Sequence, residues 1–229
     1  MTSRNNQAMG GRSSGNRFVL LLLVLIVLLI AYPYFPDNQL GAFLGALMSL
    51  ILLVSGVYAV RMNKRTHIVA SILAFLAGSA SVMALARGTR GHPLVESAFF
   101  LFQAFTTVVI FLEVIKAKQV TKETIYGIVC VYLLIGVTFG TLYDLNETLQ
   151  PGSFQINVSV EGKDSIRWRD MIFFSFMTLT TIGYGDITPV TTQAQSLALI
   201  EGVIGVLYVA VLVARMVGIY SQTDGNFDD

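Results

Sequence analysis

The stretch Thr180-Thr181-Ile182-Gly183-Tyr184-Gly185-Asp186 decides how this sequence is interpreted. Gly183 and Gly185 stand at alternate positions in it. Successive backbone carbonyls can point toward one axis only where unusual backbone conformations alternate, and glycine adopts such conformations without steric cost. The stretch can therefore present a row of carbonyl oxygens, to which the hydroxyl of Thr181 adds one more ring of oxygens at one end.

The composition points to lipid as the solvent around this chain. Hydrophobic residues make up 54% of the 229 residues and charged residues only 13%, and the mean hydropathy is +0.68. Soluble domains carry about a quarter charged residues. The net charge of +1 gives no reason to expect a nucleic-acid partner. The single cysteine, Cys130, can form no disulfide within the chain.

Apolar runs divided by short polar breaks predict six membrane-spanning helices, each near the roughly 20 residues that cross a bilayer. They cover about Phe18–Tyr34, Leu40–Val60, His67–Ala86, Leu94–Ile115, Thr124–Leu145 and Gln195–Gly218. A further apolar stretch, Met171–Leu179, is too short to cross. We expect it to lie in a re-entrant helix over Trp168–Thr180 that is shielded from lipid by protein.

The first span has a second interpretation, a cleavable signal peptide, because Arg12 and Arg17 precede a leucine-rich core. Against it, no small-x-small cleavage site precedes Pro33, and the apolar run continues through Tyr32 and Tyr34. We favour a retained helix and keep the signal peptide as the alternative.

Basic residues indicate how the spans are oriented. With the amino terminus inside, ten arginines and lysines fall on the cytoplasmic side and five on the outer side, in agreement with the positive-inside rule. The cytoplasmic set is Arg4, Arg12, Arg17, Arg61, Lys64, Arg65, Lys116, Lys118, Lys122 and Arg215, and the outer set is Arg87, Arg90, Lys163, Arg167 and Arg169. We expect both termini in the cytoplasm and a location in the plasma membrane, or in the inner membrane of a Gram-negative bacterium.

The glycine-containing stretch has the chemistry that a potassium ion needs in order to cross lipid. The ion must exchange its hydration oxygens for other oxygens, several at a time, and rows of carbonyls supply them. Unpaired backbone of this kind survives at membrane depth only where it lines a cavity. The short preceding helix directs the partial negative charge of its carboxyl end toward the cation. Asp186 adds negative charge at the other mouth.

Residues of about Thr124–Gly218 resemble the pore module of the tetrameric potassium channels, with an outer helix, a pore helix, a selectivity filter and an inner helix. The resemblance implies an all-α membrane protein with six transmembrane helices plus a re-entrant pore helix and filter loop, assembled as a homotetramer. The four preceding spans resemble the six-helix branch of this superfamily in number and placement. The implied function is passive, potassium-selective conduction without classical voltage gating.

The resemblance also implies roles for individual residues. The potassium ligands are the carbonyls of Thr181, Ile182, Gly183 and Tyr184 and the hydroxyl of Thr181, with filter support from Thr180, Gly185, Asp186 and Glu201. Gly205 lies twenty residues after Gly185, where these channels often have a glycine that lets the inner helix bend. Helix packing is the other interpretation of Gly205, and the two stay open.

These expectations divide the chain into a disordered cytoplasmic tail (1–16), a four-helix transmembrane domain (17–120), a pore domain (121–219) and a short cytoplasmic tail (220–229). The expected partners are potassium ions, membrane lipids and further copies of the chain. We expect no cofactor and no enzymatic activity, because the carboxylates within the spans, such as Glu113 and Glu201, have no His or Asp nearby in the sequence.

Two features depart from the familiar members of the superfamily. Voltage-gated members carry Arg or Lys at every third position of the fourth span, whereas Leu94–Ile115 has only Glu96 and Glu113. Voltage acts on charge, at about 2.3 kcal/mol per unit charge per 100 mV, so we expect weak voltage dependence. In the pore helix, residues that brace related filters are replaced by Phe173, Phe174 and Met177.

Glu201 is the residue that we expect to replace this bracing. A carboxylate about nine residues into the last helix is costly unless it finds a partner. Our hypothesis is that it bonds N–H groups or hydroxyls behind the filter, such as those of Thr178 or Thr180. The alternative is that it lines a wet crevice.

Smaller patterns give two local predictions. Close helix packing is expected at small residues, namely Gly41 and Gly45, Gly136 and Gly140, and the run Ala77-Gly78-Ser79-Ala80. Alternating apolar and polar residues over Phe154–Val160, followed by a turn at Glu161–Asp164, predict a small outer hairpin that continues toward Ile166 and Trp168.

Rival functions are less consistent with the sequence. A non-selective cation channel is the nearest alternative, but such relatives tend to lose the tyrosine that stands here as Tyr184. A potassium uptake transporter should show four internal repeats, whereas the sequence has one pore loop. A scaffold or auxiliary subunit would not need the filter at all.

Overall fold

The computed structural model describes residues 16–36, 38–61, 63–87, 93–117, 119, 121–157 and 166–224. Within these ranges the chain forms seven α-helices, one 3-10 helix and two short strands. The predicted amino-terminal tail lies outside the described residues, apart from Asn16, at which the first helix begins.

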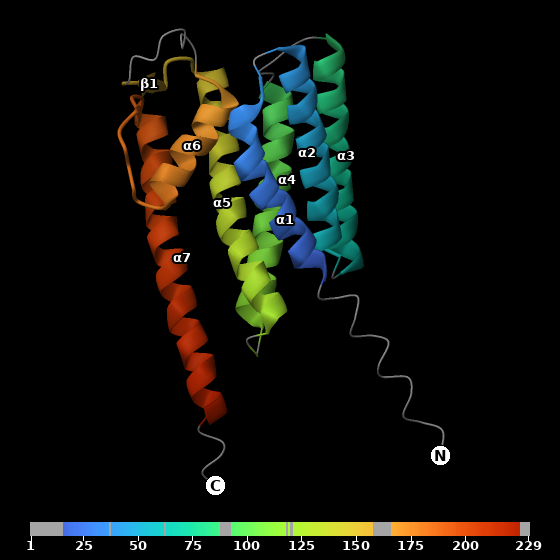
Figure 1. Ribbon diagram of the computed structural model, residues 1–229, viewed down its shortest axis with the longest axis vertical. Helices are drawn as coiled ribbons and strands as arrows, with labels where there is room; N and C mark the ends of the chain where they lie inside the picture. Colours follow the sequence, from blue (N-terminus) through green and yellow to red (C-terminus); the bar gives the residue numbers. More distant parts are fainter. Residues whose placement is uncertain are drawn as a thin grey trace, which may run out of the picture.

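The long helices stand side by side and share a common direction (Figure 1). Helices α1 to α5 form one bundle, the short helix α6 lies obliquely between α5 and α7, and α7 extends beyond the bundle. Their bounds are Asn16–Ala31 (α1), Gln39–Ala59 (α2), Lys64–Arg87 (α3), Pro93–Lys116 (α4), Lys122–Leu149 (α5), Trp168–Leu179 (α6) and Thr192–Asp224 (α7).

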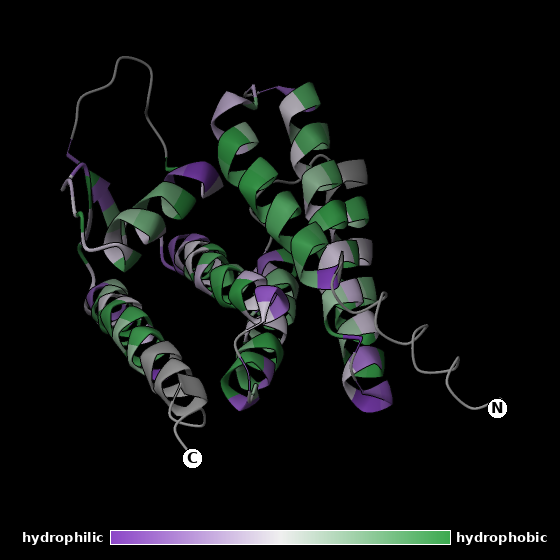
Figure 2. Ribbon diagram, turned by 60° about the horizontal axis from the view of Figure 1, so that its bottom comes forward, coloured by the Kyte–Doolittle hydropathy of each residue, from purple (hydrophilic) through white to green (hydrophobic). Residues whose placement is uncertain are grey.

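Among the described residues, six helices are long and apolar enough to cross a membrane, which confirms the predicted number. Apolar residues dominate their middle turns in Figure 2, and polar residues gather at several of their ends. The predicted bounds need small corrections. Pro33 lies in a 3-10 turn, η1 (Tyr32–Tyr34), that ends the first span, because its ring disfavours continuation of an α-helix. At the other end of the chain, α7 runs past the predicted Gly218 to Asp224.

The predicted hairpin is only partly described, because residues 158–165, including the predicted turn, lie outside the described residues. Its described strand pairs with a different segment from the one predicted. Strand β1 (Phe154–Ile156) pairs antiparallel with β2 (Ile187–Pro189), which follows the glycine-containing stretch, with Gln155 opposite Thr188. Trp168 instead begins α6, because the Asp170 carboxylate accepts a hydrogen bond from the Arg167 N–H at 3.0 Å and caps the helix there. We call the end of the molecule that carries β1 and β2 the strand end.

Small residues set the helix packing at two of the three predicted places. A Cβ added at Gly136 or Gly140 would lie within 2.6 Å of a side chain of α6, and one at Gly78 would touch Leu50. The prediction is wrong for Gly41 and Gly45 within one chain. A Cβ at Gly41 would strike the turn that precedes α2, and one at Gly45 would meet nothing within 4 Å.

Polar contacts join the helices at the end opposite to the strands. The Arg17 guanidinium of α1 donates to Glu113 of α4 and, at 3.1 Å, to Glu123 of α5. The Arg215 guanidinium of α7 donates to the backbone carbonyl of Ala117, in the connection between α4 and α5, at 2.7 Å. The last helix is thereby tied to the five-helix bundle at this end.

Candidate functional site

Helix α6 lies in a groove on α5 that glycines create. Ile172 packs over Gly140 and Phe176 over Gly136, where any Cβ would come closer than 3.0 Å to these side chains. The two glycines are four residues apart and so share one face of α5. This contact fixes the position of α6 and of the loop that leaves its carboxyl end.

We call that loop, Thr180–Asp186, the filter loop. Gly183 and Gly185 have φ values of +55° and +76°, and Thr181 has a φ of +59°. Among the described residues, Thr181 is the only one other than glycine with positive φ, so positive and negative values alternate along the loop. The alternation predicted from the glycines is confirmed. A β-branched residue in this conformation is strained by about 1–3 kcal/mol, which is typical of functional sites.

The inner end of the filter loop is held by the last carbonyls of α6. The N–H groups of Ile182 and Gly183 both donate to the Met177 carbonyl, at 3.0 and 3.1 Å. The Thr181 N–H donates to Thr178 at 3.0 Å. These bonds orient three consecutive N–H groups toward the helix, so the loop backbone is anchored on one side only.

The outer end of the filter loop is held by Asn157, which directly follows β1. Its side-chain amide donates to the Gly185 carbonyl at 2.9 Å and to the Thr188 hydroxyl at 3.0 Å. Its backbone N–H donates to the Asp186 carbonyl at 2.8 Å. The Asp186 carboxylate accepts from the neighbouring Ile187 N–H at 3.0 Å. Strand β1, whose pairing partner was predicted wrongly, thus leads into the residue that supports the loop.

Aromatic side chains fill the space behind the filter loop. Tyr143, Phe154 and Phe174 pack edge-to-face in a three-way contact, with ring centroids 5.1–5.4 Å apart. Phe173 stacks on Tyr184 of the loop, with centroids 6.3 Å apart and planes within 14°. Phe173, which the sequence analysis identified as a departure, therefore contacts the filter loop, while Phe174 packs in the aromatic cluster behind it.

Glu201 is fully buried behind the filter loop and bonds hydroxyls as predicted, but Thr178 and Thr180, the residues given as examples, are not its partners. Its carboxylate accepts hydrogen bonds from the Tyr143 hydroxyl of α5, at 2.5 Å, and from the Ser175 hydroxyl of α6. The Thr180 hydroxyl turns back instead to the Phe176 carbonyl of its own helix. The reason is the helical spacing, which directs Ser175 toward α5 and α7 while Thr180 has already left α6.

Gly205 lies against the carboxyl end of α6. A Cβ there would come within 2.3 Å of the Leu179 carbonyl oxygen, and α7 continues as one helix past this position. The close approach favours the packing interpretation of Gly205. The Leu179 carbonyl also accepts a long hydrogen bond of 3.4 Å from the Tyr132 hydroxyl.

One side of the filter loop is open in a single chain. Residues Thr180 to Gly185 are all exposed, and Ile182 and Tyr184 expose 51% and 70% of their surface. A single chain therefore leaves this flank of the loop uncovered. In the described part of the chain, no group of three or more His, Cys, Asp or Glu residues could hold a metal ion.

Sequence reasoning missed three residues of this site. Tyr143 follows Gly136 and Gly140 at helical spacing and so shares their face, a signal that was available. Ser175 had no signal of its own. Asn157 lies in a connection whose pairing depends on the three-dimensional fold.

Comparison with known proteins gives a family match over the carboxyl-terminal part of the chain. Residues 127–222 match the ion channel family. "Two pore potassium channel a" of Oryza sativa subsp. japonica is 28% identical over 108 residues, 44% of this chain and 27% of that protein. "Potassium channel protein kcv" of Paramecium bursaria Chlorella virus 1 is 46% identical over 46 residues, 20% of this chain and 49% of that protein. "Protein LctB" of Bacillus caldotenax is 27% identical over 100 residues, 43% of this chain and 74% of that protein.

The chain thus spans less than half the length of the two curated potassium channels named here. The match covers most of α5, α6, the filter loop and most of α7, and it begins after α1 to α4. The matched family consists of ion channels, which is consistent with the expectation of a non-enzyme.

Proposed function

We propose that this multi-pass membrane protein, whose residues 127–222 match the ion channel family, conducts potassium ions selectively and passively through a pore lined by its filter loop. The observation that carries the proposal is the alternation of backbone conformation over Thr181–Gly185, anchored on α6 at one end and on Asn157 at the other. Carbonyls presented in this way replace the hydration shell of the ion. The proposed ligands are the carbonyls of Thr181, Ile182, Gly183 and Tyr184, with the Thr181 hydroxyl.

In the proposed arrangement, residues 121–219 form the pore domain and residues 17–120 a four-helix domain beside it. The strand end faces outward and both termini lie in the cytoplasm of a plasma-membrane protein, as the distribution of basic residues indicates. The nearest rival is a non-selective cation channel. The stacking of Tyr184 on Phe173 favours the selective channel, because it holds the residue that non-selective relatives tend to lose.

Substitutions in the filter loop test the proposal directly. Thr181→Ala should weaken the innermost ion site, because it removes a ring of hydroxyl oxygens. Tyr184→Asp should erode discrimination against sodium, because it removes the ring that stacks on Phe173. Reversal potentials under a potassium/sodium gradient in reconstituted bilayers measure both effects. Tyr184→Phe, which keeps the stacked ring, is the matched control and should stay closer to wild type. A wild-type protein without preference for potassium would refute the proposal.

Assembly is the second test. One chain supplies one strand of carbonyls, whereas known potassium filters surround the ion with four such loops. The exposed flank of Ile182 and Tyr184 is the surface that neighbouring copies would cover. Native mass spectrometry of the detergent-solubilised protein should give a homotetramer. A monomer or dimer as the largest stable species would contradict this assembly.

Voltage dependence is the third test. Helix α4 carries no Arg or Lys before Lys116 in its last turn, and Glu113 is already paired with Arg17. Open probability should therefore change little between about −100 and +100 mV, since one charge gains only about 2.3 kcal/mol per 100 mV. Single-channel recording across this range measures the slope. A gating charge of several elementary units per channel would show that another element senses voltage.

A further inference from the structure

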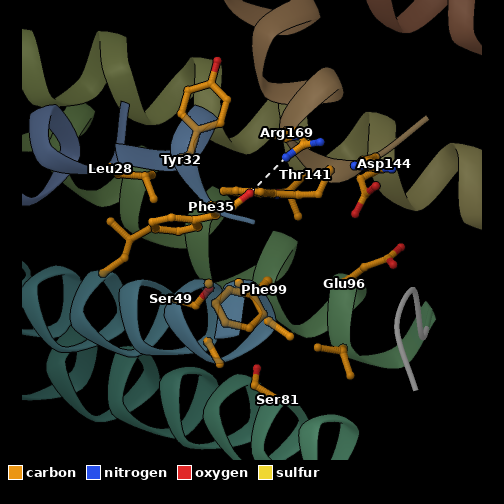
Figure 3. Close-up of a pocket in the computed structure, with 18 of the residues that line it drawn as sticks. Leu28, Tyr32, Phe35, Ser49, Ser81, Glu96, Phe99, Thr141, Asp144 and Arg169 are labelled. Carbon is orange, nitrogen blue, oxygen red and sulfur yellow. Dashed lines mark hydrogen bonds between the residues drawn. The ribbon is translucent and has the colours of Figure 1, made fainter. Parts of the chain in front are cut away.

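A large cavity lies at the strand end between α1, α2, α4, α5 and the beginning of α6. Its volume is about 1120 Å³. Figure 3 shows Glu96 and Asp144 at its edge, on α4 and α5, with their carboxylates directed into the same part of the space. The cavity is separate from the filter loop, since Thr180–Asp186 contribute nothing to its lining. We call it the lateral cavity.

Two carboxylates of the lateral cavity lack a cationic partner among the residues that the structure describes. Glu96 is 8% exposed, and only one of its oxygens accepts a hydrogen bond, from the Thr148 hydroxyl at 3.1 Å. Its Oε2 atom is buried with no partner. Asp144 accepts no hydrogen bond from any described residue and lies within electrostatic reach of Glu96 and Glu147. The buried carboxylate of Glu96 and the partly buried one of Asp144 are costly until a cation or a proton neutralises them.

Two arginines, Arg167 and Arg169, also line the lateral cavity. Arg169 donates to the Phe35 carbonyl at 3.1 Å, and the Arg167 backbone N–H donates to the Asp170 carboxylate at 3.0 Å. The described lining holds three carboxylates, Glu96, Asp144 and Glu147, against these two guanidinium groups. The cavity therefore retains an excess of negative charge.

Five aromatic rings lie in the remaining wall, among small, aliphatic and polar residues. They come from Tyr32, Phe35, Phe43, Phe99 and Trp168, and Tyr32 meets Trp168 edge-to-face at 6.3 Å. Aromatic faces attract organic cations, and the attraction is strongest where water is excluded. Metal ions are a poorer fit, since no cluster of three or more metal-binding residues occurs in the described part of the chain. The volume is sufficient for a small organic molecule.

From these contacts we propose that the lateral cavity binds an alkylammonium group, with Glu96 and Asp144 accepting its N–H donors and the aromatic rings enclosing its alkyl part. The group can belong to a free amine or to the headgroup of a membrane lipid. The site is independent of conduction through the filter loop, so it can fail while the proposed function stands.

Butylammonium binding to the purified full-length protein tests this site. Trp168 is the only tryptophan of the chain, so its fluorescence reports on the cavity, and isothermal titration calorimetry measures binding independently. We expect saturable binding of butylammonium and none of 1-butanol, its uncharged counterpart. Glu96→Gln and Asp144→Asn should each weaken binding by about tenfold or more, because each removes a charge-assisted hydrogen bond.

Glu123→Gln is the matched control, since it also removes one carboxylate from α5 but at the opposite end, where Glu123 bonds Arg17. It should bind butylammonium like wild type. Both cavity variants keep the shape of the side chain and remove a buried charge, so their melting temperatures should equal or exceed that of wild type. The variants lie on different helices, and if one does not assemble, the other decides the result.

Absence of saturable binding, or equal affinity in wild type and both cavity variants, would overturn the proposal. Protonation would then be the way in which the two carboxylates are neutralised. Nanodiscs distinguish the source of the ammonium group. Weaker butylammonium binding in phosphatidylethanolamine than in phosphatidylcholine, which is also zwitterionic but has no N–H donor, would identify the lipid headgroup as the competing ligand. Equal binding in the two lipids would assign the cavity to a free amine.

Discussion

Replacing Gly205 by alanine is expected to remove most of the potassium current. The new Cβ would lie 2.3 Å from the Leu179 carbonyl oxygen and 3.1 Å from its carbon, both backbone atoms that cannot rotate away. Overpacking of this kind costs about 1–3 kcal/mol and shifts the backbone. The shift would fall on the end of α6, one residue before the filter loop begins, and would move the Met177 carbonyl that anchors Ile182 and Gly183.

Single-channel recording distinguishes the two interpretations of Gly205. If the glycine allows close packing, alanine should lower unitary conductance and the melting temperature of the assembled protein. If it is a gating hinge, alanine should change open probability and leave unitary conductance intact. Gly202→Ala is the control on the same helix, because a Cβ there meets nothing within 4 Å in the chain. A Gly205→Ala protein that conducts and melts like wild type would contradict both interpretations.

The second large effect is expected at Glu201. Alanine would leave the hydroxyls of Tyr143 and Ser175 buried without their acceptor, at a cost of about 1–3 kcal/mol for each group. It would also leave a cavity between α5, α6 and α7. We expect Glu201→Ala to speed inactivation or lower conductance, and to lower the melting temperature.

Glu201→Gln is the matched comparison, since it keeps the size of the side chain and one acceptor oxygen. Its effects should be smaller than those of alanine. Tyr143→Phe removes one donor while retaining the aromatic contacts with Phe154 and Phe174, so it isolates the hydrogen bond from the packing. If Glu201→Ala and Glu201→Gln both conduct like wild type, with unchanged selectivity and open-state lifetime, Glu201 does not brace the filter.

Hydropathy and glycine spacing predicted the helices and the filter backbone. The six spans follow from run lengths of apolar residues, a signal that lipid imposes on each helix separately. The positive φ values of Gly183 and Gly185 follow from the residue type itself. The groove of Gly136 and Gly140 follows from their spacing of four. Each of these signals is local, so a single sequence contains it.

Contacts between distant segments could not be predicted from the sequence. β1 pairs across more than thirty positions with a strand on the other side of α6, and no pattern within Phe154–Val160 specifies that partner. The same holds for Glu201, whose hydroxyl partners lie 58 and 26 residues away. Thr181 adopts a conformation that its own residue type disfavours. It is stabilised by bonds that form only when α6 ends beside it.

The open flank of the filter loop has a consequence for inheritance. Under the proposed assembly, each copy supplies one wall of a shared conduit and leaves Ile182 and Tyr184 for its neighbours to enclose. A single mutant copy, such as one carrying Gly205→Ala, would then impair conduction in every mixed assembly that contains it. Co-expression of mutant and normal copies in equal amounts would leave only a small minority of intact assemblies. Loss-of-function alleles would behave as dominant, far beyond the halving expected from gene dosage.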